Sequence, residues 1–244
     1  YDVMSMDWRG QGLSVRELPN RDMGYVKDFE LYINDLELFY NRYVVPLKQP
    51  VTIMAHSMGG HIALRFLAQC SDRINIPKAI LIAPMLDIVT APIPRTISSI
   101  MASLAVRIGF GLNYVLGGKD YCRETVQFEN NLLTHDIDNF WFEHKEIEKN
   151  RNLALGGVSW WWLKVAFDSI DIIKNKEYLS NIKTKIQIFS AEEDRIVCND
   201  VQKQVCPMIP DGTLISIPGS RHEILFETHD IKTVLWNHIS NFLK

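Results

Sequence analysis

Short apolar runs alternate with segments of helical periodicity along most of the chain. Runs typical of buried strands lie at Tyr1–Met6, Val51–Ala55, Ala79–Ala83, Lys185–Ser190 and Thr213–Ile217. Apolar residues recur at helical spacing between these runs, at Val26–Tyr43, Gly60–Gln69, Asp200–Met208 and Ile231–Leu243. Strands that alternate with helices of this length predict an α/β fold, with a mostly parallel central sheet covered by helices on both faces.

The alternation stops after Ala79–Ala83 and resumes at Lys185. The residues between open with two prolines in "IVTAPIPRTISS" and continue as mostly helical sequence without a clear strand. We therefore expect a core formed by residues 1–89 and 183–244, with residues 90–182 inserted as a helical cap.

Composition and charge exclude several classes of protein. The chain has 47% hydrophobic and 23% charged residues and a formal net charge of −3, as in an ordinary globular protein. Its 26 lysines and arginines are scattered, so nucleic acid is not an expected partner. The four cysteines lack metal-ligand spacing and are expected to be free thiols of a reducing compartment. The expected location is the cytoplasm, with peripheral attachment to the inner face of the membrane as the alternative.

The stretch "VTIMAHSMGG" carries the first candidate for chemistry. Ala55, Ser57 and Gly59 fit the pattern small-x-Ser-x-Gly, in which a sharp turn between strand and helix exposes a nucleophilic serine. The amide of Met58, at the start of the following helix, would then stabilise an oxyanion. The alternative is a serine that only caps a helix packed through its glycines.

Two later residues favour the nucleophile. A serine hydroxyl needs a base, and the base needs an acid that orients it. Asp194 and His222 follow Ser57 in the order Ser, Asp, His, and each comes directly after a predicted strand. Glu192 and Glu193 compete with Asp194 for the role of the acid, and Asp87 after the preceding strand is a further alternative. No H-E-x-x-H pair is present, so a zinc site is not expected.

Five blocks of sequence together resemble a known family. The blocks "DWRGQGLS", "AHSMGG", "LIAPMLDI", "AEEDRIV" and "HEILFE" resemble the bacterial lysophospholipase and monoacylglycerol lipase family of serine α/β-hydrolases, and the lysophospholipase branch most closely. The resemblance includes "LTHD" and "GGVSWWW" inside the insertion. It implies an α/β-hydrolase fold with a helical cap, Ser57 as nucleophile, Asp194 as acid and His222 as base. It also implies hydrolysis of one acyl ester bond in a lysophospholipid or monoglyceride, without a cofactor or metal.

The beginning of the sequence departs from that family. The run at Tyr1–Met6 corresponds to the fourth strand of the family's fold, so three strands are expected before it. The loop after the third of these strands carries an "HG" motif in the family and supplies a second oxyanion amide. From usual strand, helix and loop lengths, we expect at least about 50 residues before Tyr1 in the whole protein.

Large apolar residues in the insertion are candidates for binding an acyl chain. One stripe at helical spacing is formed by Ile97, Ile100, Met101, Leu104 and Ile108, and "SWWWL" places three tryptophans in a row. We expect most of these residues to pack the cap against the core. The candidates for substrate binding are Trp160, Trp161, Trp162, Ile100 and Leu104. A small amphiphilic lipid is the expected partner, with peripheral membrane contact through the cap.

The sequence thus predicts a carboxylic ester hydrolase that cleaves lysophospholipids or monoacylglycerols through an acyl-enzyme. A serine aminopeptidase of the proline-iminopeptidase type is the second enzymatic hypothesis. It requires cap carboxylates for a free amine, for which Glu143, Glu146 and Glu148 are available, although their mixed-charge segment is typical of a solvated helix face. The third hypothesis is a non-catalytic scaffold that keeps the three residues without the oxyanion loop.

Overall fold

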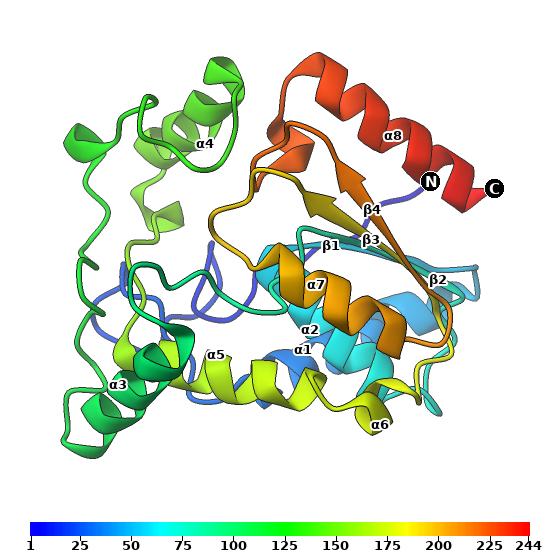
Figure 1. Cartoon of the computed structure of the whole chain (residues 1–244), viewed down its shortest axis with the longest axis horizontal. Coiled ribbons are helices and arrows are strands. Elements are labelled where there is room, and N and C mark those ends of the chain that lie inside the picture. Colours follow the sequence, from blue (N-terminus) through cyan, green and yellow to red (C-terminus); the bar gives the residue numbers. More distant parts are fainter.

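Four parallel strands form the central sheet of the protein. A computed structural model describes residues 1–244 and gives the strand order β1-β2-β3-β4. The strands are β1 Thr52–His56, β2 Lys78–Ile82, β3 Lys185–Ala191 and β4 Gly212–Ile217. The pairs Ile82 with Phe189 and Ala191 with Ile217 align their carboxyl ends at one edge (Figure 1). The predicted α/β fold class is confirmed, and the four strands lie within one residue of their predicted positions.

Helices cover the sheet on both faces. The first face packs against α1 Glu30–Phe39, α2 Ser57–Gln69 and α7 Asn199–Val205, and the second face packs against α8 His229–Leu243 (Figure 1). Alternate residues of β2 divide between the two apolar clusters: Leu81 belongs to the larger one, and Ile80 belongs to the one under α8. Burial on both faces explains why β2 reads as a continuous apolar run.

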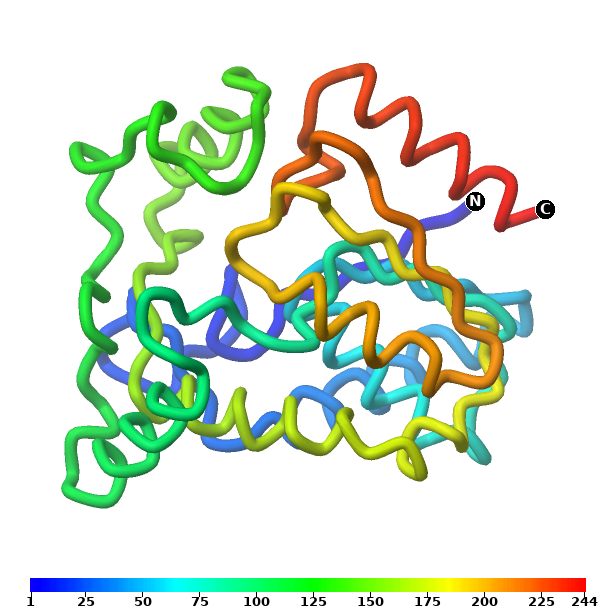
Figure 2. Tube along the Cα trace, in the orientation of Figure 1, coloured from blue at the N-terminus to red at the C-terminus, as the bar shows by residue number.

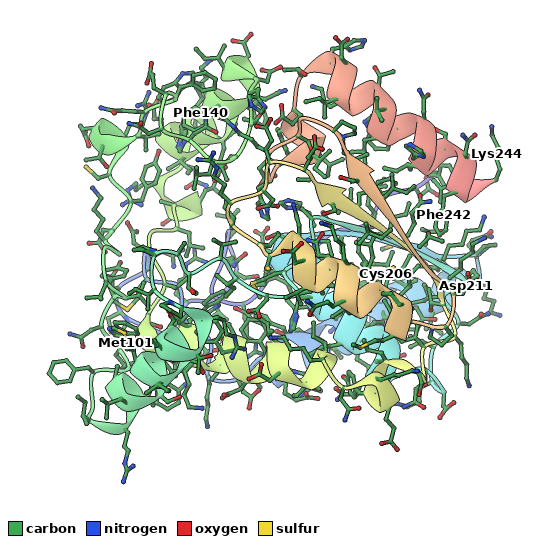
Figure 3. The ribbon with its side chains drawn as sticks, viewed as in Figure 1. Met101, Phe140, Cys206, Asp211, Phe242 and Lys244 are labelled. Carbon is green, nitrogen blue, oxygen red and sulfur yellow. The ribbon has the colours of Figure 1, made fainter.

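The predicted insertion contains α3 Arg95–Arg107, α4 Ile137–Lys149, α5 Trp160–Ile173 and α6 Lys176–Leu179. In Figure 3, Met101 on α3 and Phe140 on α4 mark the part of the insertion that lies away from the sheet. By contrast, Ala166 and Ile173 of α5 are fully buried members of the larger core cluster. Single turns complete the chain: a π-helical turn at Tyr40–Val44, and 3-10 turns at Val45–Leu47, Arg123–Thr125, Arg151–Leu153, Cys206–Met208 and Ile224–Phe226.

The predicted strand at Tyr1–Met6 is wrong. A strand is held by backbone hydrogen bonds to a neighbour, and this segment pairs with no strand of the sheet. Its side chains are also largely in solvent, with Tyr1 100% and Val3 88% exposed. An apolar run without a partner therefore forms no regular secondary structure here. The helix predicted at Val26–Tyr43 is shorter in the structure than predicted. Helix α1 begins at Glu30 and ends at Phe39, where the π-helical turn follows.

Helix α3 does not pack through its apolar stripe. Ile100 and Leu104 are 62% and 53% exposed, whereas Ser98 and Ala102 on the opposite side are buried. The small side chains let α3 approach α5, and Arg95 adds an ion pair with Asp171 of α5 at 2.6 Å. The expectation that this stripe packs against the core is wrong.

The chain has no helix with both the length and the apolar character that a bilayer span needs.

Candidate active site

Ser57 stands on a strained turn where β1 meets α2. Its backbone φ is +51°, in the left-handed region that non-glycine residues rarely adopt. The residue before it, His56, is the last of β1, and Ser57 is the first of α2. The first amide groups of a helix have no partner inside the helix, so the Met58 amide at the second position is available to an external oxygen. This geometry is that of a nucleophile elbow.

The small residues around the elbow are not equally constrained. A Cβ added at Gly60 would lie 2.8 Å from Pro84 Cβ, closer than side-chain atoms approach one another. A Cβ at Gly59 would lie 3.8 Å from Trp8 Nε1 and 4.0 Å from Ala55 Cβ, in ordinary contact. Gly60, which lies outside the sequence pattern, is therefore the glycine that packing against Pro84 requires.

Three predicted residues meet at the carboxyl ends of the strands. His222 Nε2 lies 2.8 Å from Ser57 Oγ, and His222 Nδ1 lies 2.7 Å from Asp194 Oδ2. A carboxylate only accepts, so Nδ1–H donates to Asp194, and Nε2 is left to accept the Ser57 hydroxyl proton. The side chains of Asp194 and His222 are 0% and 4% exposed, which shields this relay from water. The arrangement can activate a serine for attack on a carbonyl.

Each competing carboxylate has a different partner. Glu192 accepts from the Gly219 amide at 2.8 Å, and Glu193 lies 3.4 Å from His135 Nε2. Asp87 is paired with Arg95 and Lys174. Asp194 is thus the carboxylate within hydrogen-bond distance of the His222 ring, and the amides of Ile196 and Val197 fix its second oxygen at 2.8 and 3.0 Å.

His56 joins the elbow to the loop of His222. Its Nε2 donates to the backbone carbonyl of His222 at 3.1 Å, and the two rings are 4.8 Å apart. Burial lowers the pKa of His56, which favours the neutral ring that this single bond needs. His56, His222 and Glu223 also form a cluster of metal-ligating side chains, but Asp194 and Ser57 already engage both nitrogens of His222.

A buried carboxylate ties the insertion to the loop of His222. Glu227 is 0% exposed and lies 2.9 Å from His135 Nδ1, while its oxygens accept from the amides of His135, Arg221 and Thr228. The other ring nitrogen of His135 faces Glu193, beside Asp194. His135 therefore bridges the loops that follow β3 and β4. The sequence patterns assign no role to His135, and the signals for this network are the blocks "LTHD" and "HEILFE".

The cap carboxylates differ from one another. Glu146 and Glu148 pair with Lys149 and Arg123, as a solvated face would. Desolvation by the surrounding protein, followed by the charge of Glu223, raises the pKa of Glu143. Glu143 therefore lies near the loop of the catalytic histidine candidate.

The three consecutive tryptophans have different environments. Trp161 and Trp162 pack against the larger core cluster, and Trp161 Nε1 donates to the Lys27 carbonyl at 3.0 Å. Trp160 is outside that packing. A role in substrate binding remains a prediction for Trp160, as it does for Ile100 and Leu104 on the exposed face of α3.

Comparison with known proteins identifies similar chains. A family model described as serine aminopeptidase S33 matches residues 1–229. A probable lysophospholipase L2 of Haemophilus influenzae is 28% identical over 244 residues, which are 100% of this chain and 75% of that protein. Lysophospholipase L2 of Escherichia coli K12 is 28% identical over 254 residues, covering 99% of this chain and 72% of the relative. A monoglyceride lipase structure from Saccharomyces cerevisiae superposes with a TM-score of 0.75 at 21% identity, over 98% of this chain and 75% of that one.

These comparisons confirm the resemblance drawn from the five sequence blocks. The solved structure supports the fold, and the two relatives belong to the branch that the blocks resemble most closely.

Proposed function

The chain belongs to the serine aminopeptidase S33 family, and from that premise we propose that it is a serine esterase acting on lysophospholipids or monoacylglycerols. The observation that carries the proposal is the continuous relay from Asp194 through His222 to a Ser57 held at a positive φ. The names of the two relatives, both lysophospholipases, support an acyl ester as the substrate.

In this proposal Ser57 Oγ attacks the ester carbonyl while His222 Nε2 takes the hydroxyl proton. The Met58 amide donates to the oxyanion, and Asp194 holds the imidazolium that forms. His222 then gives the proton to the departing glycerol oxygen, which leaves the acyl group on Ser57. In the second half His222 takes a proton from water, the hydroxide attacks the acyl carbon, and His222 returns the proton to Ser57 Oγ as the acyl–oxygen bond breaks and the fatty acid leaves.

The test combines a covalent probe with a substrate panel. A fluorophosphonate should form one Ser57 Oγ–phosphorus bond with loss of fluoride, and intact mass should show one adduct that Ser57→Ala abolishes. The same protein should release fatty acid from monoacylglycerol or lysophospholipid. Labelling with no ester turnover would overturn the esterase proposal, and no labelling would favour the scaffold.

One observation supports the aminopeptidase as a second candidate. Desolvation, and then the charge of Glu223, raise the pKa of Glu143, and a carboxylate in such surroundings is a candidate partner for the free amine of a peptide. Cleavage of prolyl-nitroanilide with no turnover of acyl esters would establish this alternative. Under the esterase proposal, Glu143→Gln leaves ester turnover within about twofold of wild type.

We further propose that the exposed face of α3 contacts the lipid surface. Its apolar side chains are 49% to 62% exposed at Ile97, Ile100, Leu104 and Ile108. Such a contiguous face is unfavourable in water and suits the boundary between headgroups and acyl chains. Ile100→Ser with Leu104→Ser should reduce sedimentation with phospholipid vesicles, whereas Val234→Ser, an exposed apolar site on α8, should not. Equal binding by both variants would contradict the contact.

A further inference from the structure

A polar cavity of about 250 Å³ is lined in part by the loops that carry Asp194 and His222. It is lined by residues 129–132 of the insertion, by Glu193 and Arg195 after β3, and by Arg221 after β4. Glu193 and Arg195 flank Asp194 in sequence, and Arg221 precedes His222. Figure 2 shows these two loops, gold and orange, projecting toward the green insertion. The cavity is smaller than the roughly 300–1,000 Å³ of pockets that hold a whole drug-sized ligand, so it suits one part of a substrate.

A second cavity, of about 410 Å³, has no such relation to the relay. It is lined by residues at the amino ends of the strands, including Pro77 before β2, Lys185 of β3 and Asp211 before β4. Figure 3 shows Asp211 at the end of the sheet far from Met101 on α3 and Phe140 on α4. Of these two cavities, only the smaller is lined by the loops that carry Asp194 and His222, on the side of the sheet where Ser57 lies.

The two arginines of the smaller cavity lack carboxylate partners. Ion pairs with carboxylates engage Arg9, Arg65, Arg73, Arg95, Arg123 and Arg151. Arg195 has neither an ion pair nor a side-chain hydrogen bond, although Glu129 and Glu193 line the same cavity.

Arg221 is held in place but keeps free donors. Its Nη1 donates to the carbonyls of Asn131 and Thr134, both at 3.2 Å. These bonds fix the guanidinium and leave its Nε and Nη2 without a protein acceptor. A fixed guanidinium with free donors beside a second arginine is the arrangement that recognises phosphate oxygens.

We propose that this cavity binds the phosphodiester of a lysophospholipid headgroup while the ester lies at Ser57. The inference rests on the proposed esterase function and narrows its substrate from two lipid classes to one, because a monoacylglycerol has no phosphate. Arg195 and Arg221 donate to the phosphate oxygens. Glu129 and Glu193 disfavour a free phosphate, which carries about one and a half negative charges at pH 7, more than the single charge of a phosphodiester. The glutamates also attract an ammonium group carried beyond the phosphate.

Kinetic discrimination tests the cavity. The ratio of kcat/KM for palmitoyl lysophosphatidylcholine to that for monopalmitoylglycerol is measured in the same mixed micelles. Hydrogen bonds between charged groups are strong enough that Arg195→Gln should lower this ratio roughly 10- to 100-fold. Arg42→Gln, which removes an exposed arginine outside the cavity, should leave the ratio at its wild-type value. An unchanged ratio in Arg195→Gln overturns the proposal.

Direct binding keeps the inference testable if neither ester is hydrolysed. Titration of the wild-type protein with glycerophosphocholine should show binding that Arg195→Gln weakens at least about tenfold. Inorganic phosphate should bind more weakly than glycerophosphocholine. Equal or tighter binding of inorganic phosphate would identify a site for the free anion and overturn the headgroup assignment, and no binding of either would overturn the site. Failure of the esterase itself would instead appear as no release of fatty acid from either lipid.

Discussion

A buried histidine away from the reacting groups should make the protein sensitive to acid. His61 on α2 is 0% exposed, and its Nε2 lies 2.6 Å from Ser169 Oγ on α5. Arg65 donates to the same oxygen at 3.0 Å and is paired with Glu30. Ser169 accepts from Arg65, and its own hydroxyl proton is available to donate to Nε2 of an unprotonated His61. Burial, and then the charge of Arg65, lower the pKa of His61 to about 3.

The sign and size of the effect follow from linkage. In the unfolded chain His61 becomes protonated as the pH falls below its ordinary pKa of about 6.5. In the native protein it becomes protonated only as the pH falls below its lowered pKa of about 3. Between these values the unfolded state holds more protons, so the free energy of unfolding falls as the pH falls. Each pKa unit is worth about 1.4 kcal/mol, and the lowering from about 6.5 to about 3 amounts to roughly 3–5 kcal/mol. That is a large part of the 5–15 kcal/mol that stabilises a typical domain.

The assay compares urea unfolding of wild type and His61→Gln at pH 7.0 and pH 4.5. Glutamine keeps an acceptor for Ser169 without a titrating group, and the carboxylates contribute equally to both proteins. Wild type should lose about 2–3 kcal/mol more than the variant between the two pH values. If both proteins lose the same free energy, His61 is protonated in the native state and the reasoning is refuted.

Three other substitutions test the site and its supports. Asp194→Asn should reduce kcat about ten-thousand-fold in an ester assay, since the base then loses its orientation, and a loss below tenfold would speak against the relay. Gly60→Ala should lower the free energy of unfolding by about 1–3 kcal/mol, because the added Cβ would meet Pro84. Gly59→Ala should change the free energy of unfolding by less than about 1 kcal/mol, and equal melting temperatures of the two variants would contradict this contrast. Glu227→Gln should lower kcat more than it raises KM, because it loosens the loop of the base, and a change in KM alone would point to substrate binding instead.

Local signals account for the part of the molecule that the sequence predicts correctly. The run Ala79–Ala83 is apolar throughout because both faces of β2 are buried. It can therefore be recognised as a buried strand without knowing which elements pack against it. That Ser57, Asp194 and His222 meet could be predicted for a similar reason, because residue type, chain order and a place after a strand can be checked one position at a time. Parallel strands then bring their carboxyl ends to one edge of the sheet.

Features that depend on which element packs against a segment cannot be predicted from the sequence of that segment alone. Periodicity shows that α3 has an apolar stripe, but which side faces α5 depends on the small residues Ser98 and Ala102 and on the ion pair of Arg95 with Asp171. Tyr1–Met6 has the composition of a strand and yet pairs with none. In both cases the missing information is the identity of the neighbour, which apolar spacing does not contain.

The contacts of His135 indicate that the insertion helps to position the loops of Asp194 and His222 and does more than cover them. Its two ring nitrogens face Glu227 and Glu193, which are carried by the loops of His222 and Asp194. The Thr134 hydroxyl donates to the Phe226 carbonyl at 2.8 Å, so the same short segment also holds the turn beyond His222. A displacement of this segment therefore changes the geometry of the base and of the acid together. For that reason the insertion is expected to influence turnover through the relay as well as through access of the lipid. Under the headgroup proposal, the cavity lined by the same three segments would also bring the substrate into direct contact with that junction.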